Sequence, residues 1–347
     1  MKKFFLFFLV LILFYPTNVF ALENFSLSDI SSGDFFGHDI ESIGDIDGDG
    51  ISDIAVGAPY DDDGGPSHGA VYILFLNSDG TVKDSQKISS TEGNFQGVID
   101  SGDCWGNAIT SLNDFDGDGI TDIAVGAHGD SENGFSRGAV YILFLNSDGT
   151  VNFYEKINSK QNNFKFQLND SDMFGTSVTN IGDINNDGIT DIAVGSPGDD
   201  DTKELRKTII EQSEGSSRGA VYILFLNSDG TVKDSQKISS TEGNFQQNLQ
   251  SQDMFGFSTA NLSDINNDGI TDIAVGSPHR HYFDAELSPI HILLLEKDGK
   301  VKYSETIPSE NDTKINPEIY YFLGIPLIFV IFLVIIAKIK LRNSNQK

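Results

Sequence analysis

The chain has 347 residues and a formal net charge of −28. An acidic excess of this size argues against nucleic acid and anionic membrane surfaces as partners, because their phosphates would be repelled. Short apolar runs between its 35 glycines, rich in Phe, Ile and Val, indicate an all-β fold.

Residues 1–21 are typical of a signal peptide. Two lysines precede an apolar run from Phe4 to Tyr15, which ends at Pro16. Val19 and Ala21 then fit the small-residue positions of a cleavage site. We therefore expect cleavage after Ala21, with an uncleaved membrane anchor as the alternative.

The central part of the chain repeats one unit four times. The stretch "DIDGDGISDIAVGAP" from Asp45 has near-copies from Asp114, Asp183 and Asp264. Each unit opens with Asp-x-(Phe/Trp)-Gly, and later carries a run such as "GAVYILFL" followed by a turn signal. We expect four strands per unit, which in the first unit lie near 36–43, 53–57, 70–76 and 81–88.

Four-stranded units repeated along a chain predict the blades of a β-propeller. A linear β-solenoid is the rival fold, but its repeats are normally much shorter. Residues 69–96 and 219–246 are identical, so these strands are expected to do structural work while distinct roles lie in the loops. Within an extracellular domain over 22–307, the predicted blades are 34–95, 103–160, 172–245 and 253–307.

The acidic loop of each unit has the spacing of a cation site. Acids or amides stand at positions one, three and five, a glycine at six, a backbone carbonyl at seven and an aspartate at nine. Oxygen ligands on a tight turn suit Ca²⁺, whereas Mg²⁺ demands stricter geometry and zinc prefers His or Cys. An EF-hand is excluded, because position twelve is a valine in a predicted strand rather than a glutamate.

We therefore expect about four structural Ca²⁺ ions, one per loop, in preference to acidic turns that bind nothing. An amide replaces one carboxylate in the last two loops, so these are expected to bind more weakly. The acidic runs Asp61–Asp63 and Asp199–Asp201 are expected to be solvated, with a further cation site as the alternative. The predicted ligands are Asp45, Asp47, Asp49, Ile51 and Asp53; Asp114, Asp116, Asp118, Ile120 and Asp122; Asp183, Asn185, Asp187, Ile189 and Asp191; Asp264, Asn266, Asp268, Ile270 and Asp272.

The C-terminal residues are typical of a membrane anchor. Residues 319–337 form an apolar run long enough to cross a bilayer as one helix. The basic residues in 338–347 would hold that tail in the cytoplasm. With a short stalk over 308–318, the sequence predicts a single-pass cell-membrane protein whose N-terminal bulk is extracellular.

The (Phe/Trp)-Gly start, the Asp-x-(Asp/Asn)-x-Asp-Gly-x-x-Asp loop and the Gly-Ala-Pro end together resemble the FG-GAP repeat, the blade of the integrin α-chain β-propeller. The resemblance covers about residues 24–307 and implies Ca²⁺ in the loop between the first two strands of each blade. It also implies a ligand on the opposite face, which here comprises Tyr60–His68, His128–Arg137, Gly198–Arg218 and His279–Ser288. Integrin-type propellers have seven blades, so either these four close alone or they pair with a second copy as a homodimer.

Variable loops on a repeated, anchored scaffold favour a cell-surface adhesion or recognition module that binds an extracellular protein or glycan. We do not expect an enzyme. One alternative is an extracellular hydrolase or lyase, which would depend on the polar cluster around His279 and His281, since no Gly-x-Ser-x-Gly, His-Glu-x-x-His or phosphate-binding loop is present. A passive surface protein is the other alternative.

Overall fold

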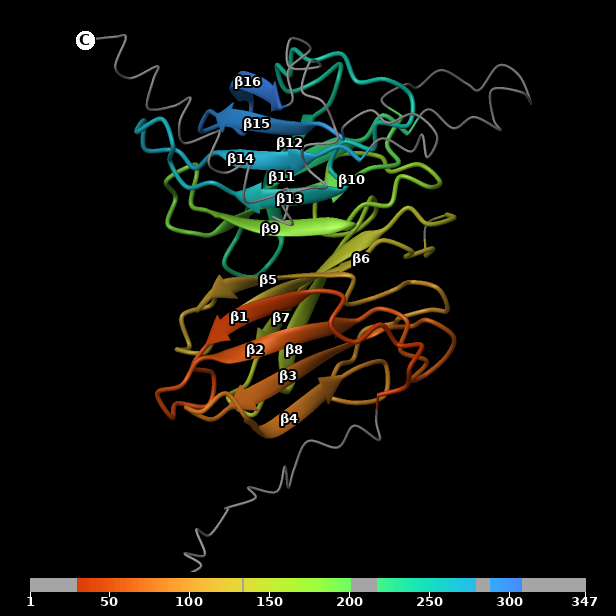
Figure 1. Ribbon diagram of the computed structural model, residues 1–347, viewed down its shortest axis with the longest axis vertical. Coiled ribbons are helices and arrows are strands. Elements are labelled where there is room, and N and C mark those ends of the chain that lie inside the picture. The colour runs from red at the N-terminus through yellow and green to blue at the C-terminus, as the bar shows by residue number, and fades with distance from the viewer. Residues whose placement is uncertain (1–29, 133, 201–216, 279–287, 308–347) are drawn as a thin grey trace, which may run out of the picture. The chain divides into compact units, whose positions relative to one another are not determined.

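The structure, a computed structural model, describes residues 30–132, 134–200, 217–278 and 288–307. These residues form sixteen strands in four antiparallel sheets of four strands each, and they contain no helix (Figure 1). Every sheet follows chain order from its first strand to its fourth. The all-β prediction and the four strands per unit are confirmed, and the sheets have the form of propeller blades.

The strands are bounded as follows. The first sheet contains β1 Ile40–Gly44, β2 Asp53–Ala58, β3 Ala70–Leu76 and β4 Val82–Ile88. The second contains β5 Ala108–Asn113, β6 Asp122–Ala127, β7 Ala139–Leu145 and β8 Val151–Ile157. The third contains β9 Ser177–Gly182, β10 Asp191–Ser196, β11 Ala220–Leu226 and β12 Val232–Ile238. The fourth contains β13 Ser258–Asn261, β14 Ile273–Gly276, β15 Ile290–Leu295 and β16 Val301–Ile307.

Both membrane-related segments, the leader over 1–21 and the apolar run over 319–337, lie outside the described residues, as do the stalk and the tail. Within the described ranges no helix is long and apolar enough to cross a membrane. By its internal contacts the chain divides into Met1–Ser304 and Glu305–Lys347. All four sheets belong to the first unit, apart from the last residues of β16.

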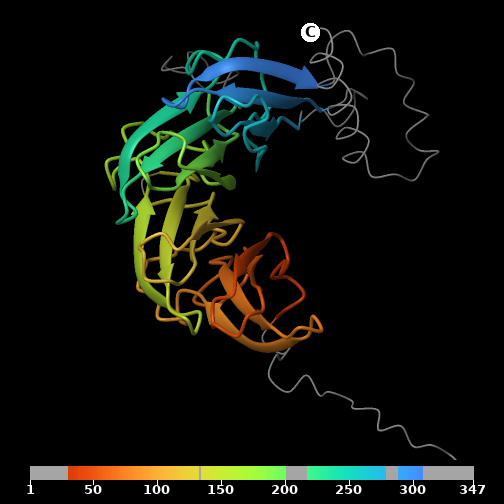
Figure 2. The same cartoon turned by 90° about the vertical axis from the view of Figure 1, so that its left-hand side faces the viewer.

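The sheets follow one another in chain order (Figure 2). A separate hydrophobic core lies between each pair of consecutive sheets. The third strand of each sheet carries the sequence "AVYILFL" in the first three units, and both of its faces are apolar. Its Val, Ile and Phe side chains pack on the following sheet, and in the second and third sheets its Tyr and Leu side chains pack on the preceding one. The sequence of a strand that is buried on both faces is a continuous apolar run rather than an alternation of apolar and polar residues.

The glycines of the repeated motif lie where backbones of consecutive sheets touch. A Cβ added at Gly57, Gly126 or Gly195 would stand 2.0, 2.1 or 1.8 Å from the carbonyl oxygen of the glycine that opens the next unit. Real Cβ atoms do not approach an oxygen so closely, so only glycine fits there. The Phe/Trp-Gly start and the Gly-Ala-Pro end of neighbouring units therefore form one contact between sheets.

A buried ionic group recurs in the first three sheets, as the second shows. Lys156 Nζ lies 2.6 Å from Asp130 Oδ2 and 2.7 Å from Glu132 Oε2, and 5.3 Å from the centre of the Tyr141 ring. The first and third sheets place Asp61 and Asp199 in the same position, each bonded by a tyrosine hydroxyl and a lysine. The expectation that Asp61 and Asp199 are solvated is therefore wrong, because both are 2% exposed and each is satisfied inside its sheet.

Candidate functional site

The acidic loops connect the first and second strands of each sheet. In the first loop the Asp45 carboxylate accepts hydrogen bonds from the backbone N–H groups of Gly48, Asp49 and Gly50, at 2.7–2.9 Å. Gly50 has φ +89°, a left-handed conformation that glycine adopts without steric cost. The chain is thereby wrapped around the first aspartate of the loop.

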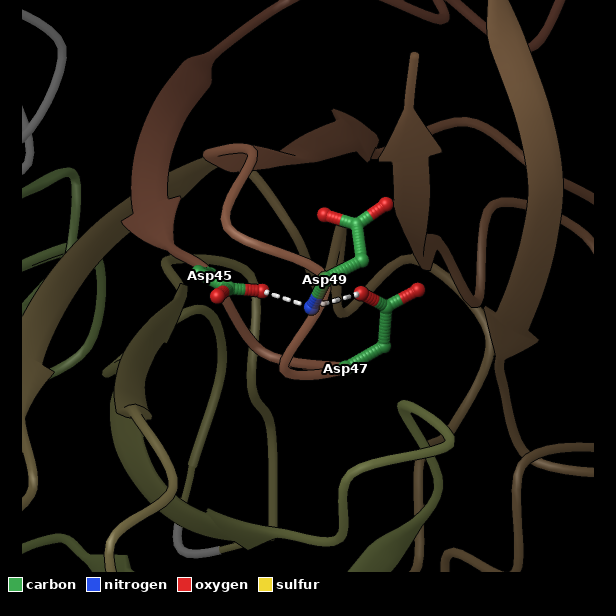
Figure 3. A group of neighbouring side chains, drawn as sticks. All are labelled: Asp45, Asp47 and Asp49. Carbon is green, nitrogen blue, oxygen red and sulfur yellow. Dashed lines mark hydrogen bonds between the residues drawn. The ribbon is translucent and has the colours of Figure 1, made fainter. Parts of the chain in front are cut away.

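This turn gathers three carboxylates on an exposed surface. Asp45, Asp47 and Asp49 each bring an oxygen within 4.8 Å of the others (Figure 3). Asp114, Asp116 and Asp118 form the same group in the second loop. Like charges this close repel one another, so such a group is stabilised by a cation.

Lysines from the fourth strands supply positive charge to three of the four loops. Lys83 Nζ lies 2.7 Å from Asp47 Oδ2 and also pairs with Asp49. Lys233 pairs with Asp187 at 2.8 Å, and Lys302 pairs with Asp268 at 2.7 Å. The hydrogen bond from Lys83 holds the pKa of Asp49 below its usual value. The ammonium groups lie among carboxylate oxygens, the kind of ligand that the hard ion predicted from the sequence prefers.

The second loop differs, because Asn152 occupies the position of these lysines. No lysine of the described residues is paired with its three carboxylates. Among the four loops it therefore has the most negative local charge.

The third and fourth loops carry amides at position three. The side-chain nitrogen of Asn185 donates to Asp191 at 3.3 Å, and that of Asn266 donates to Asp272 at 3.2 Å. In both loops the first aspartate still accepts hydrogen bonds from the backbone, as Asp45 does. The residues at position seven were predicted to offer a backbone carbonyl oxygen to the ion. Their backbone N–H groups donate hydrogen bonds to the aspartate at position five; these residues are Ile51, Ile120, Ile189 and Ile270.

The aspartate at position nine is buried in every loop and ties it to the third strand. Asp53 accepts from Ile46 N at 3.1 Å and from Leu76 N at 2.8 Å, and Asp122, Asp191 and Asp272 repeat both bonds. Burial raises the pKa of Asp122 and Asp191 to about 7 and that of Asp272 to about 6. Each carboxylate oxygen of Asp53 and Asp122 accepts one of these bonds and retains a second lone pair, whereas Asp191 and Asp272 also accept from the side chains of Asn185 and Asn266. All four aspartates remain predicted ligands.

The predicted ligand face is described in part. Residues 133, 201–216 and 279–287, including the His279 and His281 cluster, lie outside the described residues. In the connections that are described, Tyr60 is 40% exposed and Phe135 is 71% exposed. Phe35 and Val98, in the connections that lead into the first strands, are also exposed, and the Phe35 ring contacts the Tyr60 ring edge-on at 4.9 Å. Exposed aromatic side chains are thus present among the predicted ligand loops.

A polar cleft of about 730 Å³, which was not predicted from the sequence, runs along the first strands β1, β5, β9 and β13. Asparagine side chains link these strands: Asn107 donates to Thr176 O, Asn180 to Ser111 O and Asn261 to Asn180 O, at 2.7–2.8 Å. They satisfy backbone groups at strand edges that have no further strand to pair with. The polar residues that alternate along the first strand of each unit are the signal that could have revealed it.

Comparison with known proteins agrees with this geometry. The FG-GAP repeat family matches the chain four times, over residues 40–74, 105–143, 174–224 and 255–293. Integrin alpha-2 of Mus musculus is 28% identical over 290 residues, which cover 79% of this chain and 21% of that protein. Integrin alpha-3 of Cricetulus griseus is 30% identical over 230 residues (65% and 19%), and integrin alpha-PS5 of Drosophila melanogaster is 31% identical over 181 residues (51% and 15%).

The chain thus spans about a fifth, or less, of the length of these relatives. Each family match contains the first two strands of one sheet, the acidic loop between them and most of the third strand. The chain is therefore an FG-GAP repeat protein, integrin-like in sequence.

Proposed function

We propose that the chain is a calcium-binding adhesion or recognition module of the cell surface. The observation that carries this proposal is the pair of three-carboxylate groups, Asp45–Asp49 and Asp114–Asp118, on loops of one repeated form. Similarity to integrin α chains supports an adhesion role, and the predicted leader and apolar C-terminal segment support an extracellular position. The partner is an extracellular protein or glycan.

Bound Ca²⁺ would supply positive charge that holds the loop closed and carries no reaction. The aspartates at positions one, three and five would be its ligands, together with the carbonyl at seven and the aspartate at nine. In three loops the ion competes with a lysine that already lies among these oxygens. In the second loop no lysine of the described residues competes and all three acidic positions are carboxylates, so we propose that it binds Ca²⁺ most tightly.

Replacing Lys83 by asparagine and Asn152 by lysine should change the calcium affinities of their loops in opposite directions. An exposed ion pair contributes about 0.3–1 kcal/mol, so its removal corresponds to a change of about two- to fivefold in affinity. Lys83→Asn should raise the calcium affinity of the first loop by this factor. Asn152→Lys should lower the calcium affinity of the second loop, the tightest phase of the titration, by the same factor. Isothermal titration of the full chain with CaCl₂ measures both, and Lys160→Asn, an exposed lysine outside the loops, is the control. Unchanged phases in both variants would contradict the competition.

Ligand binding should depend on the exposed aromatic side chains of the second-to-third-strand connections. Tyr60→Ser and Phe135→Ser remove apolar contact area that is already in solvent, so folding should be little affected. Beads carrying the full chain would be tested against an array of immobilised glycans and matrix proteins in CaCl₂. A partner retained by the wild type should lose at least about tenfold in affinity with either variant, as is usual for interface aromatics. Phe153→Ser, an exposed aromatic on β8, should bind normally, and an equal loss there would refute the assignment of this face.

A further inference from the structure

Consecutive sheets pack on one another in the same way in all three interfaces. The front face of a sheet packs on the preceding sheet, and its back face packs on the following one. On the front side, a Cβ at the turn glycine Gly149 would lie 3.2 Å from Ile73 Cβ of the preceding sheet. Gly299 makes the same approach to Ile223, at 3.1 Å. The chain therefore contains one type of sheet interface three times.

Among the described residues, no sheet lies against the front face of the first sheet. Its third and fourth strands have the same sequence as those of the third sheet, so burial of identical residues can be compared directly. Leu226 is 0% exposed and Val232 is 1% exposed, whereas their counterparts Leu76 and Val82 are only partly buried. A Cβ added at Gly80, the counterpart of Gly149, would meet no heavy atom of the described residues within 4 Å.

The back face of the fourth sheet is likewise not covered by any sheet of the described residues. Leu262, Ile265 and Leu294 are partly exposed there, and their counterparts Ile181, Ile184 and Phe225 in the third sheet are buried by the fourth. At Gly276 an added Cβ would meet only atoms of Ser258, as far as the described residues go. At Gly195, one sheet earlier, it would stand 1.8 Å from the backbone oxygen of Gly256.

We propose that these two faces are occupied by a second copy of this chain. The front face of each first sheet packs on the back face of the partner copy's fourth sheet. Sequence identity points to this occupant. The third strand of the first sheet has the same residues as the third strand of the third sheet. In the third sheet, the front-face side chains of that strand cover the back face of the second sheet. Such a contact joins two different patches, so it is heterologous, and two copies close it into a ring.

A ring of two copies would contain eight four-stranded sheets, within the range of propeller sizes. The first strands of all sheets would then line one common channel. The hydroxyl, amide and carboxylate groups around the cleft along β1, β5, β9 and β13 fit a water-filled channel. This proposal depends on the sheet faces alone and is independent of the calcium and ligand proposals.

Gly276→Ala tests the interface with a single methyl group. Among the described residues the added carbon meets only Ser258, whose flexible hydroxyl can turn away, but in the ring it would press on the partner's backbone, as at Gly57, Gly126 and Gly195. Light scattering of the purified full chain in 150 mM NaCl should give twice the chain mass for the wild type. For Gly276→Ala we expect the single-chain mass at the same concentration, from at least a tenfold weaker association. Its melting curve, taken under conditions where both proteins are monomeric, should match that of the wild type.

A mixing experiment tests that the contact is heterologous. Leu76→Glu damages only the front face, and Gly276→Ala damages only the back face, so each variant alone should be monomeric. Mixed with different affinity tags, they should co-purify, because the back of the first variant and the front of the second are intact. Phe153→Glu, on an exposed side of β8, is the control and should stay dimeric.

Three results would overturn the proposal. A monomeric wild type would show that these faces are not joined between copies. Variants that fail to co-purify would exclude the front-to-back contact. A dimer that survives both single substitutions would show that the copies associate elsewhere.

Discussion

Replacing Lys156 by methionine is expected to lower the free energy of unfolding by about 3–5 kcal/mol, the usual cost of removing one partner of a buried ion pair. Lys156 Nζ lies 2.6 Å from Asp130 Oδ2, and the side chains of Lys156 and Asp130 are 10% and 3% exposed. Methionine fills most of the same volume but leaves the Asp130 carboxylate buried without its cation. The Tyr141 hydroxyl, 3.5 Å from Asp130 Oδ2, cannot compensate for that charge.

Urea unfolding of the full chain, followed by tryptophan fluorescence, measures this loss. The only tryptophan, Trp105, is fully buried and its ring lies 6.2 Å from that of Tyr141, so it reports on this part of the second sheet. Lys160→Met changes an exposed lysine and should alter stability by less than about 0.5 kcal/mol. The double variant Lys156→Met/Asp130→Asn should recover part of the loss, because the uncompensated charge is gone. If it were less stable than Lys156→Met alone, the loss would not come from the unpaired carboxylate.

Replacing Gly126 by alanine is the second change with a large expected effect. The added Cβ would stand 2.1 Å from the Gly175 oxygen and 3.3 Å from the Ala108 Cβ. Both belong to packed backbone or core, so the second and third sheets must move apart. Overpacking of this kind costs about 1–3 kcal/mol, and rigid backbone on the other side places Gly126→Ala at the upper end.

Gly33→Ala is the matched control for this prediction. Gly33 does not have a left-handed φ, and an added Cβ would meet no described heavy atom within 4 Å. Its melting temperature should therefore be unchanged or slightly raised, since alanine restricts the unfolded chain. Equal destabilisation by the two substitutions would show that the contact between sheets is not the reason for glycine in the motif.

The strands of this fold follow closely from the sequence, because burial on both faces requires long apolar runs. β3 was predicted at 70–76 and is Ala70–Leu76. The first strand is shorter than predicted and starts at Ile40 rather than near Phe36. Phe35 and Gly37 have φ values of +55° and +88°, so the chain turns there before it can enter a strand. The motif Phe-Gly marks that turn and the sheet contact, and it does not begin the strand.

Contacts between distant positions could not be predicted from local patterns. Lys83 is separated from Asp49 by 34 residues, so the spacing of residues within the acidic loop does not predict that Lys83 pairs with it. Asp61 looked like part of a solvated acidic run, because its partners Tyr72 and Lys87 belong to later strands. The repeat itself could have revealed the loop lysine, since a lysine recurs at 83, 233 and 302 and is replaced only at Asn152.

The measurement that tests the central claim most directly is scanning calorimetry of the full chain, with 2 mM CaCl₂ and then with excess chelator. When the ion concentration is about ten times the dissociation constant, each site adds on the order of 1.4 kcal/mol to the free energy of unfolding. Four such sites therefore add about 5–6 kcal/mol. For a domain of this size that corresponds to a shift in melting temperature on the order of 10 °C. We predict a fall of this size on chelation, reversed by added Ca²⁺ and reduced in Asp116→Asn. An unchanged melting temperature, with no Ca²⁺ bound to the purified protein, would contradict the assignment of the acidic loops as structural calcium sites.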